Sequence, residues 1–128
     1  MKYDTPWHER PFAPAPGTAL CRLADIPDGE GREFAFGEGR RTFRMFVVRR
    51  GGAAWGFLNI CPHFQLPVNF REHEFVNADR TLIMCMNHCA MFRYEDGVCV
   101  DGPCEGDRLN PVPVAVTEAG QVVVGAPL

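Results

Sequence analysis

Cys61-Pro62-His63 and Cys85-Met86-Asn87-His88 are the two short segments that decide how this 128-residue chain folds. Each segment supplies one thiol and one imidazole, and 85 − 63 − 1 = 21 residues separate the two segments. Two cysteines and two histidines suit either a zinc ion or an iron–sulfur cluster of mixed ligation. The sequence therefore predicts one metal centre, held by Cys61, His63, Cys85 and His88.

The spacing within each segment predicts its local structure. A proline separates Cys61 from His63 and disfavours helix there, so both side chains project together from a strand end or a rigid loop. Cys85 and His88 are three residues apart, which requires a turn. The apolar run Thr81–Met84 is expected to be the strand that leads into this turn.

The rest of the chain reads as short strands separated by glycine and proline turns. Alternating polar and apolar residues predict strands over Arg32–Phe36 and Thr42–Arg49, and Gly51-Gly52 turns the chain into a partner strand, Ala53–Asn59. Further strands are expected over 112–116 and 121–124. This pattern favours an all-β sandwich or barrel without a long amphipathic helix.

Taken together, the two segments and the sequence around them resemble the Rieske [2Fe–2S] family, and in particular its soluble ferredoxins. Phe92–Cys99 resembles the strand-turn-strand after the second ligand segment, and Asp101–Cys104 resembles the proline loop of the family. The resemblance covers roughly residues 18 to 125. It implies an antiparallel β-sandwich or barrel with a small cluster-binding subdomain formed by two loops.

The resemblance also implies roles for the four residues. Cys61 and Cys85 would hold one iron of a [2Fe–2S] cluster, and His63 and His88 would hold the other. The protein would then be a one-electron carrier and not itself an enzyme. Its expected partners are a reductase and an oxygenase or similar enzyme, which would dock at the exposed histidine edge.

Departures from the high-potential members of the family predict a low potential. Leu66 and Asn87 stand where those proteins have a disulfide, and Ala90 and Phe92 stand where they have hydroxyl groups beside the cluster sulfurs. Hydrogen bonds to sulfur stabilise the more negative, reduced cluster, so their loss lowers the potential. We expect roughly −150 mV, at the low end of the Rieske range.

The other cysteines and the residues between the two ligand segments allow weaker predictions. Cys89 occupies a position where glycine is usual, and we expect it to be an ordinary buried residue. Cys99 and Cys104 flank a turn and are expected to be free thiols in a reducing compartment. Asn69–Asp79 is expected to form a surface hairpin or a helical turn.

Composition and length predict one domain. The proline-rich residues 1–16 form an N-terminal extension, 17–128 form a single Rieske-like domain, and about 57–104 form its cluster-binding part. The net charge of −3 argues against a nucleic-acid or anionic-membrane partner. No apolar run reaches the ~20 residues of a membrane span, and no signal peptide is apparent, so a cytoplasmic protein is expected.

Two alternatives to an electron carrier stay open on sequence grounds. Cys₂His₂ ligation also suits a closed tetrahedral zinc site in a structural or interaction module. A cluster-based redox sensor or regulatory subunit is the other alternative, and there Cys89 would matter.

Overall fold

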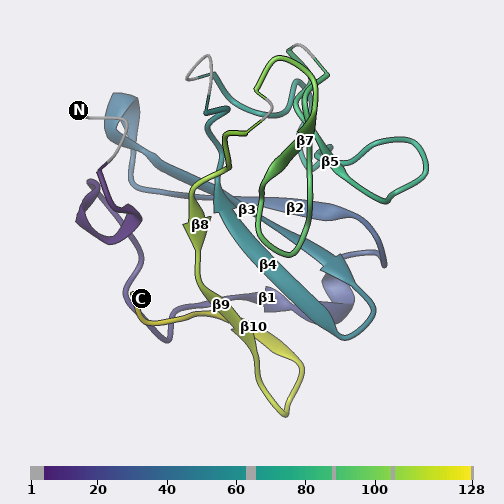
Figure 1. The fold of residues 1–128 in the computed structure, drawn as a ribbon. Helices are drawn as coiled ribbons and strands as arrows, with labels where there is room; N and C mark the ends of the chain where they lie inside the picture. The colour runs from purple at the N-terminus through teal and green to yellow at the C-terminus, as the bar shows by residue number, and fades with distance from the viewer. Residues whose placement is uncertain (1–4, 63–65, 88, 105, 128) are drawn as a thin grey trace.

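The computed structural model describes residues 5–62, 66–87, 89–104 and 106–127, and these form ten β-strands and three short 3₁₀ helices (Figure 1). The strands make three antiparallel sheets. One sheet has the order β1 (Ala19–Arg22), β10 (Gln121–Val124), β9 (Val114–Val116). The second has the order β2 (Gly31–Phe36), β3 (Phe43–Arg50), β4 (Ala53–Leu58), β8 (Pro111–Val112). The third has the order β5 (Ile83–Met84), β6 (Met91–Phe92), β7 (Cys99–Asp101). The 3₁₀ helices are η2 (Trp7–Glu9), η3 (Leu23–Asp25) and η4 (Gly39–Arg41).

Strand β3 is the wall between two hydrophobic cores. Met45 and Val47 belong to a core shared with the β1-β10-β9 sheet, which includes Val122 and Val124. Phe46 and its alternate neighbour Val48 face the other way and belong to a core shared with the β5-β6-β7 sheet. Successive side chains of a strand point to opposite faces, so burial of both faces explains why Met45 to Val48 of β3 are all apolar.

The predicted all-β antiparallel fold is confirmed, and most predicted strands are present. The structure places strands at β2, β3, β4 and β10 close to their predicted bounds, with Arg50 paired to Ala53 across the Gly51-Gly52 turn. The strand expected over Thr81–Met84 is only two residues long as β5. Its brevity follows from pairing with β6, which is equally short.

The segment Asn69–Asp79 forms bends, turns and one isolated antiparallel bridge, Val76 to Ile83. It is more deeply anchored than the predicted surface hairpin or helical turn. The Phe75 ring is fully buried and stacks on Phe46, with ring centroids 4.3 Å apart. His73 Nδ1 accepts a hydrogen bond from the backbone N–H of Glu33 in β2 at 2.9 Å.

The proline-rich N-terminal segment contributes to the core of the molecule. Trp7 on η2 is 7% exposed and packs edge-on against Phe43 of β3, with ring centroids 6.5 Å apart. Phe12 lies against Gly37 but is half exposed. Within the described residues, no helix is long and apolar enough to cross a membrane.

Candidate metal centre

The first ligand segment begins three residues after the end of β4, and backbone and side-chain hydrogen bonds hold the chain there. Cys61 is fully buried, and its backbone N–H donates to the carbonyl of Leu66 at 2.7 Å. Asn59 Oδ1 accepts a hydrogen bond from the N–H of Val68 at 2.8 Å. The chain that leaves β4 is therefore hydrogen-bonded at Asn59 and Cys61 to Val68 and Leu66. His63 lies outside the described residues.

Asn59 is a positioning residue that the sequence reasoning missed. Its side chain is 3% exposed, and its amide nitrogen donates to Glu33 of β2 at 2.8 Å and to Asn69 at 2.9 Å. These bonds satisfy a buried amide and tie the loop to the central sheet. The available signal was one polar residue directly after an apolar strand and two residues before Cys61.

The second ligand segment is a tight turn, as predicted from its spacing. Cys85 is fully buried directly after β5, and its carbonyl accepts the N–H of Cys89 at 2.8 Å. The N–H of Cys85 in turn donates to Ala90 at 2.8 Å. His88 lies outside the described residues.

Two hydrogen bonds join the second turn to the first loop. The backbone N–H of Met86 donates to Val68 at 2.7 Å, and Asn87 Nδ2 donates to Pro67 at 2.7 Å. Asn87 is the position predicted to lack the bridging disulfide, and its amide links the two loops there without one. Leu66, the other position, is 46% exposed.

A third loop, Gly102 to Cys104, lies against the second turn. Gly102 has a φ of +101°, and a Cβ atom placed on it would come within 2.8 Å of Ala90 Cα. Only glycine allows both this conformation and this close approach. Cys104 is buried beside Cys61, and burial is the main cause that raises the pKa of its thiol.

The Cys61 and Cys85 thiols lie side by side in hydrogen-bonding contact. This contact, followed by burial, raises the pKa of Cys85 far above its usual range. Hydrogen bonds from Asn87 act in the opposite direction, and its amide nitrogen is 3.8 Å from Cys85 Sγ. Two buried thiolates would repel each other, so the pair can ionise only beside a positively charged centre. The pair thus fits an iron bound through two thiolates.

Of the four predicted ligands, the structure brings Cys61 and Cys85 together and leaves the two histidines undescribed. In the described ranges, no three His, Cys, Asp or Glu side chains are grouped as a metal site. The ligand set of Cys61, His63, Cys85 and His88 therefore stays a prediction.

The predictions for the other cysteines have mixed outcomes. Cys99 and Cys104 are free thiols, as expected, and Cys99 Sγ contacts the carbonyl of Asp101 at 3.3 Å. The expectation that Cys89 is buried is wrong, because Cys89 is exposed. Its φ of +58° is the left-handed conformation that explains why glycine is usual at this position.

The residues expected to lack hydroxyl groups near the site are buried. Ala90 and Phe92 are both fully buried, and neither can donate a hydrogen bond from its side chain. The nearest tyrosine in sequence, Tyr94, directs its hydroxyl elsewhere, to the carbonyls of Gly29 at 2.6 Å and Arg80 at 3.3 Å.

Comparison with known proteins agrees with this geometry. The family model described as Rieske [2Fe-2S] domain matches residues 17–118. The ferredoxin of carbazole 1,9a-dioxygenase from Nocardioides aromaticivorans IC177 is 18% identical, with a TM-score of 0.68 over 88% of this chain and 100% of that chain. The Sphingomonas yanoikuyae B1 ferredoxin is 22% identical, with a TM-score of 0.62 over 87% and 99%.

A third similar structure is a chain in the complex of reduced oxygenase and oxidized ferredoxin in carbazole 1,9a-dioxygenase. It is 21% identical, with a TM-score of 0.64 over 84% of this chain and 90% of that chain. Among curated proteins no match was found. The chain belongs to the Rieske [2Fe–2S] domain family, and the cofactor of its metal centre is a Rieske-type [2Fe–2S] cluster.

Proposed function

We propose that this protein is a Rieske ferredoxin-type electron carrier that receives electrons from a reductase and passes them to an oxygenase or a similar oxidoreductase. The observation that carries the proposal is the buried Cys61–Cys85 pair at the junction of two hydrogen-bonded loops. When bound, a Rieske cluster takes up and gives back one electron at a time. On this proposal the protein performs no catalysis of its own, and its partner carries out the chemistry.

In the proposed ligand set, Cys61 and Cys85 hold one iron, and His63 and His88 hold the other. The chain positions the two cysteines from three directions. Asn59 closes the first loop, Asn87 joins the loops and donates toward Cys85 Sγ, and the Gly102 loop covers Ala90 beside the second turn. These contacts hold the thiols in place and exclude water from their side of the site.

The proposed potential is low, roughly −150 mV. Ala90 and Phe92 supply no hydroxyl to stabilise the added charge of the reduced cluster. The Asn87 amide is the donor that works in the opposite direction, since it lies 3.8 Å from Cys85 Sγ. A reductive titration that gives a clearly positive midpoint would contradict a low-potential carrier.

We retain the predicted organisation as part of the proposal. Residues 57–104 form the cluster-binding part of a single domain over 17–128, preceded by the extension 1–16. None of the six cysteines forms a disulfide, which suits a reducing compartment such as the cytoplasm.

The decisive experiment is an EPR spectrum of the dithionite-reduced protein, together with iron, sulfide and zinc analysis. We expect a Rieske signal, whose average g value is lower than that of an all-cysteine [2Fe–2S] site, and two irons per chain. Stoichiometric zinc with no EPR signal would instead support the zinc-module alternative. A protein that contains the cluster but passes no electrons from a reductase to an oxygenase or similar enzyme would favour the redox-sensor alternative.

Replacing either proposed histidine ligand by cysteine tests the ligand set. His63→Cys and His88→Cys are each expected to lower the potential or to abolish the mixed-ligand optical spectrum, because thiolate adds negative charge to the cluster. His73→Cys is the matched control, since His73 lies outside both ligand segments and accepts a hydrogen bond from the backbone N–H of Glu33. A His63 or His88 variant with the wild-type spectrum and potential would remove that residue from the ligand set.

A further inference from the structure

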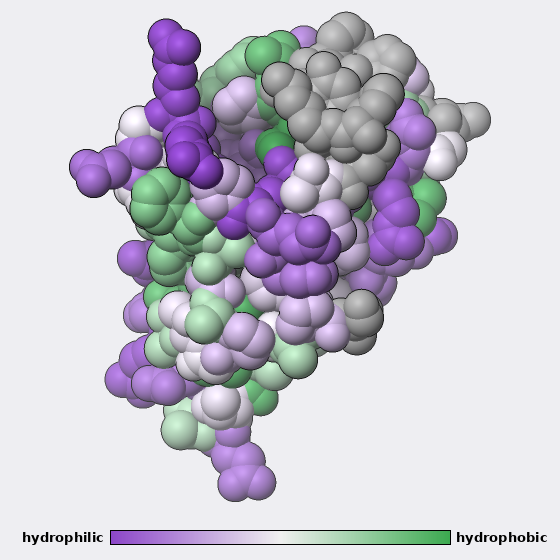
Figure 2. Space-filling model, turned by 90° about the vertical axis from the view of Figure 1, so that its left-hand side faces the viewer, coloured by the Kyte–Doolittle hydropathy of each residue, from purple (hydrophilic) through white to green (hydrophobic). Residues whose placement is uncertain are grey.

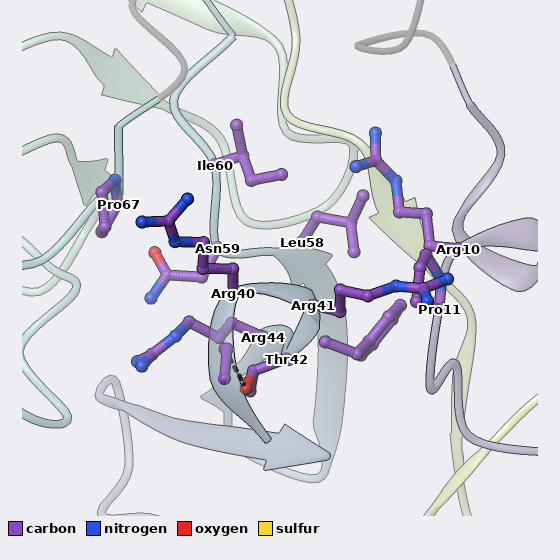
Figure 3. Close-up of a pocket in the computed structure, with 12 residues that line it drawn as sticks. Arg10, Pro11, Arg40, Arg41, Thr42, Arg44, Leu58, Asn59, Ile60 and Pro67 are labelled. Carbon is purple, nitrogen blue, oxygen red and sulfur yellow. Dashed lines mark hydrogen bonds between the residues drawn. The ribbon is translucent and has the colours of Figure 1, made fainter. Parts of the chain in front are cut away.

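Four arginines gather around one pocket beside the first ligand loop. Arg10, Arg40, Arg41 and Arg44 line a pocket of about 510 Å³ whose apolar floor includes Leu58 and Ile60. In Figure 3, Arg10 and Arg41 lie on one side of the pocket and Arg40 and Arg44 on the other, with Leu58 and Ile60 between them. Figure 2 shows hydrophilic residues in purple that project around a recess on this face. We call these four residues the arginine pocket.

The arginine pocket adjoins the proposed cluster site. Ile60 directly precedes Cys61, and Pro67, which also lines the pocket, directly follows Leu66. The hydrogen bond from Cys61 N–H to Leu66 closes the ligand loop at this point. A group bound in the pocket therefore touches both ends of the loop that carries Cys61.

Arg40 and Arg41 carry positive charge that the described part of the protein does not neutralise. In the part of the chain that the structure describes, no carboxylate forms an ion pair with Arg40 or Arg41, and both residues are exposed on η4. Arg44 lies 3.7 Å from Glu33 but keeps 55% of its side chain exposed. The same Glu33 oxygen accepts a hydrogen bond from the Asn59 amide, so this carboxylate is shared between Arg44 and Asn59.

This local charge is opposite to the charge of the whole chain, which is −3. The chain has 13 Lys and Arg residues, of which one is Lys2, so 13 − 1 = 12 are arginines and a third of them line this pocket. Arginine recognises carboxylates through a planar array of donors and is enriched at protein interfaces. Leu66, which directly precedes Pro67 in the chain, is an exposed apolar residue near the pocket.

We propose that the arginine pocket is an electrostatic docking site for an acidic surface of the electron-transfer partner. Carboxylates of the partner would lie among the guanidinium groups of Arg40, Arg41 and Arg44, and an apolar partner side chain would contact Leu66. Attraction over this face would bring the partner to the loop that carries Cys61 and raise the association rate. The inference rests on the proposed function and adds to it the chemistry of the partner surface.

The first test measures the oxidation rate of the reduced holoprotein by ferricyanide, a trianionic probe, between ~0.01 M and ~1 M salt. These salt concentrations change the screening length from about 30 Å to about 3 Å. If the pocket governs approach, the rate falls as salt rises, against the trend that the net charge of −3 would produce. Tris(phenanthroline)cobalt(III), a cationic oxidant, should gain no comparable advantage at low salt.

Single charge reversals locate the effect. Arg40→Glu and Arg41→Glu should each lower the low-salt ferricyanide rate about tenfold, near the lower end of electrostatic rate effects, and remove most of its salt dependence. Arg22→Glu is the matched control, because Arg22 is an exposed arginine that ends β1. Figure 1 shows β1 at the opposite end of the molecule from β5 and β7. An equal effect of Arg22→Glu, or a wild-type rate that rises with salt, would overturn the proposal. An unchanged EPR spectrum shows that each variant keeps its fold and its cluster.

The second test uses hexaglutamate as a model of an acidic partner surface. Its binding is followed through the arginine Nε–Hε signals in ¹⁵N NMR, and it should slow ferricyanide oxidation of the wild type but not of Arg40→Glu. Hexalysine should have no effect. Tight one-to-one binding of phthalate without binding of hexaglutamate would make the pocket a small-anion site and overturn docking. A preparation without the Rieske EPR signal would contradict the proposed function. The NMR titration would still decide separately whether the pocket binds carboxylates.

Discussion

At the scale of single residues, the hydrogen bonds around the two cysteines decide the chemistry of the site. Asn59 and Asn87 are both asparagines, but their roles differ. Asn59 closes one loop on itself, and Asn87 links that loop to the second turn while donating toward Cys85 Sγ. The motif spacing predicts neither role, because both partners, Val68 and Pro67, are backbone groups at a distance in sequence.

Asn87→Ala should lower the reduction potential by roughly 20–60 mV. This range is the electrochemical equivalent of a net hydrogen bond of about 0.5–1.5 kcal/mol for a one-electron couple. The donor lost is the amide beside Cys85 Sγ, which stabilises the reduced state more than the oxidised one. Spectroelectrochemical titration measures the shift. Asn77→Ala is the control, since Asn77 bonds only within its own turn, to Thr81 and Leu82, and its potential should equal that of the wild type.

At the scale of elements, loops carry the site and short strands hold them. The turn after β5, the loop after β4 and the Gly102 loop meet because β5, β6 and β7 are only two or three residues long. Strands this short contribute little pairing of their own. Burial of Phe75, Phe92 and Tyr94 in the core beneath them therefore supplies most of their stability.

Gly102→Ala should destabilise the loop that lies against Ala90. The new Cβ atom would come within 2.8 Å of Ala90 Cα, and the φ of +101° is strained for any other residue. We expect a loss of about 1–3 kcal/mol from backbone strain, with a further loss from the clash. Chemical denaturation measures it, and a faster loss of the visible spectrum would show greater water access. Gly120→Ala is the control, because its φ is +82° but nothing lies within 4 Å. Equal losses for both variants would show that the contact with Ala90 has no effect.

Tyr94→Phe should lower stability in a pH-dependent way. The hydroxyl donates to Gly29 from the turn between β6 and β7, and its loss should cost about 1–3 kcal/mol at neutral pH. Burial raises the pKa of Tyr94 to about 12, above the ordinary value of about 10. The protonated tyrosine therefore stabilises the fold below pH ~10 and loses this contribution as the pH rises through about 12.

The measurement is the difference in unfolding free energy between the wild type and Tyr94→Phe from pH 7 to pH 12. The gap should be constant up to pH ~10 and then narrow. A gap that widens with alkaline pH would reverse the sign of this argument. The potential of the variant should be unchanged, because the Tyr94 hydroxyl bonds to Gly29 and Arg80 and not to the cysteines.

At the scale of the whole molecule, β3 couples the N-terminal segment to the cluster-binding part. Trp7 packs on Phe43 in one core, and Phe46 packs on Phe75 in the other. Two residues of one strand, Phe43 and Phe46, thus contact the N-terminal segment and the segment between the two ligand segments. Loss of the packing of the N-terminal segment should therefore affect the metal centre only by lowering the global stability of the protein.

Trp7→Ala should lower the free energy of unfolding by about 3 kcal/mol, the lower end of the range for a buried large aromatic residue. The optical and EPR spectra of the folded protein should not change, because Trp7 belongs to the core remote from the cysteines. Phe12→Ala is the matched control in the same segment, since Phe12 is 52% exposed, and it should cost well under half as much. Denaturation followed by circular dichroism measures both. Similar small losses would mean that Trp7 does not anchor the extension 1–16 to the domain.

The sequence by itself determined the all-β fold, the family and the position of the two ligand segments. Hydrophobic alternation and Gly/Pro turns are local properties of the sequence. The spacing within each of the two ligand segments is also local and does not depend on the tertiary structure. The ligand roles of His63 and His88 remain a prediction. Tertiary structure alone decided that Asn59 and Asn87 tie the loops, that Cys89 is exposed, that Trp7 joins the core and that four arginines converge beside Cys61. The reason is physical: each of these features depends on contacts between residues far apart in sequence, whose partners no local pattern identifies.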